Sequence, residues 1–176
     1  MAKTYNSLTV ANATAGSAIL ASDQAKVFEN VNNYRVPPMC RVYRSSDWTY
    51  SGTYISWNAE HYDTDGMWSS GTDITIQTAG VYLVEASYAY TCAASNTWMG
   101  LLIAKGSVFA ARTSAPAFSS TQGFLTCSAV MSLAASDVVR LVHDPFGGSS
   151  FVAKGGAIDA ANAVTHMSVT WLGQVS

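Results

Sequence analysis

The side chains best suited to chemistry in this sequence are three histidines, three cysteines and a short acidic segment. The acidic segment, residues 61–66, reads His-Tyr-Asp-Thr-Asp-Gly and contains the Asp-x-Asp-Gly fragment found in calcium-binding loops. A calcium loop between two helices also needs a third acidic or amide group and a distal glutamate, which this segment lacks. We therefore interpret residues 61–66 as a turn whose aspartates accept hydrogen bonds from backbone amides.

The cysteines Cys40, Cys92 and Cys127 lie far apart and show none of the paired spacing of a zinc site. Each falls in a predicted strand, where cysteine usually behaves as a small buried hydrophobe. Three cysteines cannot pair completely within one chain, which argues against a secreted disulfide scaffold and for a reducing compartment. We expect no metal and no cofactor.

Catalytic signals are sparse as well. His143 precedes Asp144, but the sequence contains no Gly-x-Ser-x-Gly elbow that would expose a nucleophile. The glycines at 147–148 and 155–156 lack the context of a phosphate-binding loop. We expect the protein not to be an enzyme. A glycan-active enzyme stays open as an alternative, because carboxylates that pair in space cannot be recognised in a sequence.

Three aromatic residues, Trp48, Tyr50 and Trp68, fall in or beside predicted loops rather than in the middle of strands. An exposed aromatic ring can stack on a sugar, and tyrosine and tryptophan also favour protein interfaces. These residues are our candidates for binding a ligand at the surface. The alternative is plain packing at the edge of the fold or between subunits.

The composition limits the class of protein. The chain has 176 residues, the length of one domain, and is 49% hydrophobic but only 11% charged, against about 25% charged residues in an ordinary soluble domain. Low charge removes the repulsion that keeps monomers apart and so favours an assembly, unless serine, threonine and asparagine hydrate the surface well enough. A net charge of −2 does not indicate binding to nucleic acid, which needs a basic surface. The sequence has no apolar run long enough to predict insertion into a membrane.

Two regions position these residues, an N-terminal region over 1–38 and a head over 39–176. In the first region, small and polar residues at 1–21 predict an extended arm, and a helix is expected from its N-cap Ser22 to Tyr34, before a pair of prolines. One face of this helix is apolar, and its members are Val27, Phe28, Val31 and Tyr34. We expect the face to meet another copy or a docking partner, because a lone helix of this length is marginal in water.

The head has a strand-like period, rich in Val, Ile, Tyr, Thr and Trp between clusters of turn residues. The predicted strands are 39–44, 53–59, 73–77, 80–90, 97–104, 107–112, 122–133, 138–143 and 164–172. The longest predicted loops are 45–52, 62–72, 113–121 and 145–163. Many short strands without interleaved helices favour an antiparallel sandwich.

Residues 80–90 alternate most clearly. Tyr82, Tyr88 and Tyr90 share one face of this predicted strand, whereas Glu85 and Ser87 lie on the other. We expect the three tyrosines either in the core or along the axis of an oligomer.

Three motifs follow one another in the head. They are residues 58–67 (NAEHYDTDGM) with 74–84 (ITIQTAGVYLV), residues 130–141 (VMSLAASDVVRL) and residues 167–173 (MSVTWLG). In content and order they resemble the tumour necrosis factor and complement globular-head superfamily, in which a tyrosine-aspartate turn precedes a strand, a glycine turn and a Val-Tyr strand. The resemblance covers roughly residues 39–174.

The resemblance implies an all-β antiparallel jelly-roll sandwich of ten strands that forms a tight homotrimer, with aromatic residues along the threefold axis. The arm and helix before a prolyl junction are similar to those of tailed-bacteriophage structural proteins that carry this head. In those proteins the N-terminal segment attaches to the virion. A virion protein, assembled in the host cytoplasm and contacting other virion proteins through its arm, is therefore implied.

We expect a trimeric fibre head, spike or decoration protein whose loops contact glycans on the host surface, since three weak sites gain avidity together. The alternative is a purely structural capsid decoration or tail connector protein without a receptor.

Overall fold

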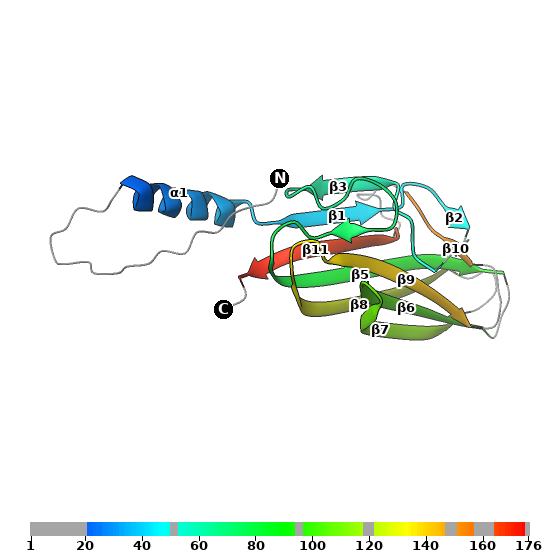
Figure 1. Cartoon of the computed structure of the whole chain (residues 1–176). Coiled ribbons are helices and arrows are strands. Elements are labelled where there is room, and N and C mark those ends of the chain that lie inside the picture. The colour runs from blue at the N-terminus through cyan, green and yellow to red at the C-terminus, as the bar shows by residue number, and fades with distance from the viewer. Residues whose placement is uncertain are drawn as a thin grey trace.

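The computed structural model describes residues 21–49, 53–93, 97–117, 122–146, 151–156 and 164–174. Within these ranges the chain forms one helix and eleven strands, arranged in two antiparallel sheets (Figure 1). The predicted antiparallel sandwich is confirmed. Residues 1–20, which hold nearly all of the predicted arm, lie outside the described residues.

The predicted helix is present as α1 (Ala21–Arg35), which begins one residue before Ser22 and ends one residue after Tyr34. Pro37 and Pro38 follow, and proline disfavours helical geometry at the residue before it. Figure 1 shows α1 projecting from one end of the sandwich, beside the start of β1 (Met39–Tyr43). Its described apolar side chains do not fold back into the core.

The larger sheet has seven strands in the order β2-β10-β5-β11-β1-β3, with β8 paired to β5. Besides β1, its strands are β2 (Trp48–Thr49), β3 (Ala59–Asp63), β5 (Gly80–Cys92), β8 (Gln122–Leu133), β10 (Phe151–Ala153) and β11 (His166–Gly173). The smaller sheet has the order β4-β9-β6-β7. Its strands are β4 (Ile74–Thr75), β6 (Thr97–Lys105), β7 (Val108–Ala117) and β9 (Val138–Phe146).

The core lies between the two sheets, because successive side chains of a strand point to opposite faces. On β5, Tyr82, Val84 and Tyr88 are fully buried, whereas Glu85 is exposed, so the predicted alternation of this strand is confirmed. The smaller sheet contributes an equally buried face, which includes Met99, Leu101, Ile103 and Leu141.

Two turns are stabilised by aspartate side chains that accept hydrogen bonds from backbone amides, and the first of them was predicted. The carboxylate of Asp63 accepts hydrogen bonds from the backbone amides of Asp65 (3.1 Å) and Trp68 (2.8 Å), as expected of the 61–66 segment. Between β8 and β9, Ser136 has a φ of 71° and the carboxylate of Asp137 accepts a bond from the amide of Ala134 (2.7 Å). Both turns fall within the motifs that resemble the globular-head superfamily.

Several predicted boundaries were wrong. Residues 53–58 form no continuous strand but only bridges from Tyr54 to Val142 and from Trp57 to Gly71, and Ala59 begins β3. Parts of all four predicted loops are strands instead, namely β2, β10 and the ends of β3, β7 and β9. These segments are short or polar, and they become strands because a neighbouring strand offers unpaired backbone groups, which local propensity does not report.

The three cysteines are buried free thiols, as predicted for core residues. Burial raises the pKa of the Cys40 thiol far above its usual range, so this thiol is protonated and unreactive. Among the described residues, no three His, Cys, Asp or Glu side chains are grouped to hold a metal. Helix α1, the one helix within the described ranges, lacks the length and hydropathy of a membrane span.

Candidate functional site

The candidate surface residue Trp48 lies on β2 and is half-buried against the core. The guanidinium carbon of Arg44 lies 5.8 Å from the centre of its ring. Arg44 is itself buried and donates from Nη1 to the carbonyl of Ser56 (2.8 Å), and its burial lowers its pKa. Trp48 therefore packs against the core and stacks with a buried arginine of the same chain. Tyr50 lies outside the described residues.

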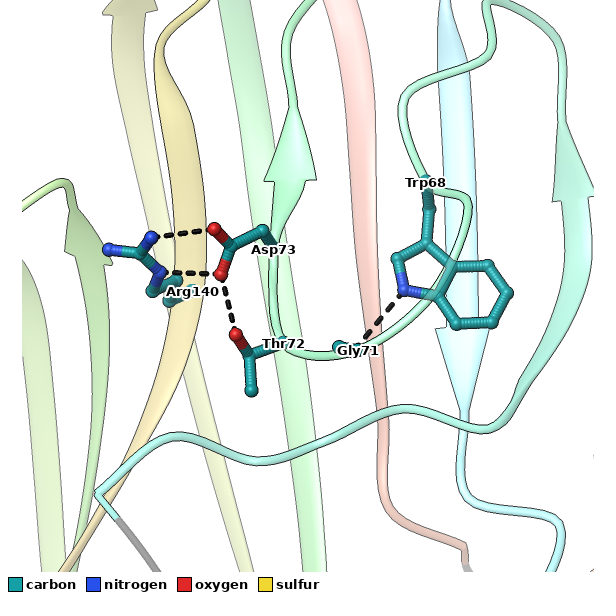
Figure 2. Close-up of polar contacts among 5 residues, drawn as sticks. All are labelled: Trp68, Gly71, Thr72, Asp73 and Arg140. Atoms are coloured by element: carbon teal, nitrogen blue, oxygen red, sulfur yellow. Dashed lines mark hydrogen bonds and ion pairs between the residues drawn. The ribbon is translucent and has the colours of Figure 1, made fainter.

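Trp68 follows the Asp63 turn and is also half-buried against the core. Its indole Nε1 donates to the carbonyl of Gly71 (3.3 Å), as Figure 2 shows. The backbone amide of Trp68 is bonded to Asp63, so both its backbone and its ring are fixed by the loop. Trp48 and Trp68 thus lie on separate segments and contribute to packing, and ligand binding by these two residues stays a prediction.

An ion pair holds the end of the same loop to β9. Nε and Nη2 of Arg140 donate to Oδ1 and Oδ2 of Asp73, both at 2.6 Å, and the hydroxyl of Thr72 donates to the same carboxylate (Figure 2). The bond from Arg140 is the main cause that lowers the pKa of Asp73. The Arg140 guanidinium also lies over the ring of Tyr54 at 5.1 Å. This arrangement fixes the loop on the sheet.

Tyr82, Tyr88 and Tyr90 all lie in the core, with exposed fractions of 0%, 0% and 2%. The hydroxyl of Tyr88 is hydrogen-bonded to Nδ1 of His143 (2.8 Å), and burial lowers the pKa of His143 to about 4. His143 is consequently neutral at pH 7, and the phenol of Tyr88 satisfies its Nδ1, as is usual for a polar atom within a core.

The apolar face of α1 is exposed to solvent in the described part of the chain. The exposed fractions of Val27, Phe28, Val31 and Tyr34 are 42%, 69%, 49% and 59%. The ring of Tyr34 lies 5.5 Å from that of Trp171, where α1 approaches the head. Adjacent exposed apolar side chains on a projecting helix mark an interaction surface.

A second surface, which the sequence analysis did not identify, is the outward face of the seven-stranded sheet. This face holds a hollow of about 620 Å³ across β3, β1, β11, β5 and β8, lined mainly by hydroxyl and charged side chains. Arg41, Tyr62, Glu85, Ser168 and His166 are among the lining residues. Burial is the main cause that lowers the pKa of His166, and the charge of Arg41 lowers it further. The sequence did contain a signal for this polar face, since Glu85 and Ser87 lie on the side of residues 80–90 opposite the tyrosines.

Comparisons with known proteins define the fold. No protein-family model and no curated protein matches the chain. Among solved structures, the globular domain of zebrafish complement 1qA protein matches with a TM-score of 0.58 at 14% identity, over 78% of this chain and 99% of that one. Murine APRIL matches with a TM-score of 0.56 at 10% identity, over 77% and 98%. Eiger TNF from S. frugiperda matches with a TM-score of 0.55 at 13% identity, over 79% and 96%.

The chain therefore has the jelly-roll fold of the tumour necrosis factor and complement globular heads, as its three motifs predicted. At these identities the likeness defines the fold alone.

Proposed function

We propose that the protein is the homotrimeric jelly-roll head of a tailed-bacteriophage virion protein, held on the particle by its N-terminal region. The observation that carries the proposal is the exposed apolar face of α1, which projects from the sandwich and needs a partner surface. The shared fold supports a head that works as part of an assembly. The low share of charged residues, 11%, supports the same conclusion, because it weakens the repulsion between copies.

For the trimer contact we propose the outward face of the seven-stranded sheet. Its edge and end carry three exposed large apolar side chains, Phe124 and Val130 on β8 and Leu172 on β11. Exposed apolar groups on one sheet face are typical of a surface that a subunit covers.

The half-burial of Trp48 and Trp68 favours a structural decoration or connector role over glycan binding by these residues. Glycan binding remains the second function to test, on an array of host-surface polysaccharides probed with the recombinant protein. A specific signal would favour a receptor-binding head, and silence would favour the structural role.

The attachment proposal is tested by particle association. Purified virions should contain the protein, and deletion of residues 1–38 should remove it from particles while the head still folds. Absence of the full-length protein from purified particles would contradict the proposed location.

A further inference from the structure

Two residues of opposite charge lie in one row across the outward face of the seven-stranded sheet. Arg41 on β1 is in register with Ser168 on β11, and Ser168 is in register with Glu85 on β5. Residues in register on antiparallel strands point to the same face, so both charges project from the outward face, about 10 Å apart at their backbones.

Neither charge forms an ion pair with a described residue, although both act electrostatically on His166. Nε of Arg41 is buried without a hydrogen-bond partner, and no ion pair joins Glu85 to a described residue. Four other pairs of charged side chains on the described part of the head do form ion pairs, and these are Lys105–Asp137, Arg112–Asp144, Arg140–Asp73 and Lys154–Asp47. A buried donor without an acceptor is costly, which points to a partner outside the chain.

The face around these charges suits a second copy of the same chain. The hollow beside Arg41 and Glu85 is lined by hydroxyl groups, and Phe124, Val130 and Leu172 are exposed elsewhere on the same face. Because the face carries a cation and an anion at separate positions, the cation of one copy can meet the anion of the next, as the repeated contact of a threefold ring requires.

We propose that Arg41 of one copy pairs with Glu85 of a neighbouring copy, and that this contact repeats around the trimer. The inference rests on the proposed homotrimer and names the charges that set its geometry. Arginine matches carboxylate with directed hydrogen bonds, and a pair covered by an interface fixes which surfaces meet. The hydroxyl groups around the pair can satisfy its remaining donors and acceptors.

A charge-swap experiment tests the pairing. The dissociation concentration of the trimer is measured by sedimentation velocity over a dilution series for the wild type, Arg41→Glu, Glu85→Arg and the double variant. Each single reversal should raise the dissociation concentration by about tenfold or more, because like charges then face each other. The double variant should return to within about threefold of the wild type, since the pair is restored in reverse.

Glu60→Arg is the matched control, because Glu60 is an exposed glutamate of the same sheet. A β-bulge between Arg41 and Val42 shifts the register, so Glu60 is opposite Val42, which is buried in the core, and its charge acts on the buried thiol of Cys40. Glu60 therefore lies off the outward face. This variant should leave the dissociation concentration unchanged, and circular dichroism should show that every variant is folded.

The outcomes separate the two proposals. A trimer whose dissociation is unaffected by the single reversals, or is not restored in the double variant, overturns the pairing and leaves the homotrimer standing. A wild-type protein that sediments as a monomer at every concentration overturns both.

Discussion

Arg140 and Asp73 form a two-point ion pair in which Nε and Nη2 each donate to one carboxylate oxygen at 2.6 Å. The pair joins strand β9 of the smaller sheet to the loop that carries Trp68, as Figure 2 shows. A two-point arginine–carboxylate contact is the geometry in which a surface ion pair contributes most. The loop is therefore held in place by charge as well as by packing.

Asp73→Asn should lower the free energy of unfolding at pH 7 by about 1 kcal/mol, because it removes this contact. The pKa of Asp73 is lowered in the folded state, chiefly by its bond with Arg140. Its contribution is thus present above the unfolded pKa of about 4 and is lost as the pH falls through the folded pKa.

Urea denaturation at pH 7 and at pH 3 measures both effects. Asp144→Asn is the control, since Asp144 is as exposed as Asp73 but pairs through one longer bond of 3.3 Å with Arg112, which is more exposed than Arg140. The control should change stability by less than about 0.5 kcal/mol. An equal loss in the two variants would contradict the role assigned to Asp73.

His143 should make the protein less stable in mild acid. Burial lowers the pKa of His143 to about 4, below its unfolded value of about 6.5. Between these values the unfolded chain binds more protons, so stability rises with pH from about 4 to 6.5 and levels off above. His143→Gln should flatten this slope in urea denaturation curves, and an unchanged slope would exclude His143 as its cause.

Tyr88→Phe should lower the free energy of unfolding by roughly 1–3 kcal/mol, because it removes the hydroxyl bonded to Nδ1 of buried His143. Thermal unfolding by calorimetry measures the loss. Tyr43→Phe is the control at a half-buried tyrosine whose hydroxyl has no hydrogen bond to a described residue. A loss at Tyr88 no larger than that at Tyr43 would count against the buried pair.

Gly80→Ala should destabilise the head by about 1–3 kcal/mol. A Cβ at Gly80 would collide with the indole nitrogen of Trp171 and would lie 2.6 Å from the carbonyl oxygen of Gly173. At Gly173 an added Cβ meets nothing within 4 Å, so Gly173→Ala should change stability by no more than about 0.5 kcal/mol. Chemical denaturation of the two variants compares them, and equal losses would disprove the close approach at Gly80.

Phe28→Ser should separate attachment from folding. Phe28 is 69% exposed on α1, so its loss should change the stability of the head by less than about 0.5 kcal/mol. Association with particles that lack the protein should fall strongly in a co-sedimentation assay. Gln24→Ser, at an exposed polar position of the same helix, should bind like the wild type. Full binding by Phe28→Ser would remove this side chain from the attachment surface.

The long, regular elements were predictable from the sequence. Strands β5 and β8 alternate over many residues, and α1 ends before two prolines, so their patterns identify them directly. The buried tyrosines, the cysteines and the Asp63 turn follow from the same local rules. The two-residue β2 and the three-residue β10 do not, because strands that short exist only where a neighbour pairs with them.

The surfaces were harder to predict than the core. Arg41, Ser168 and Glu85 come from three strands far apart in the sequence, and only the strand register brings them into one row. For the tryptophans the sequence left exposure and packing open, and Trp48 and Trp68 are half-buried against the core. Loop position does not determine burial where a loop folds back over the sandwich.

The mass of the full-length protein in solution tests the central claim most directly, because attachment geometry and charge pairing both depend on the trimer. Size-exclusion chromatography with light scattering should give three times the chain mass of 18.6 kDa. A single peak at the mass of one chain, unchanged as the protein is concentrated, would contradict the account.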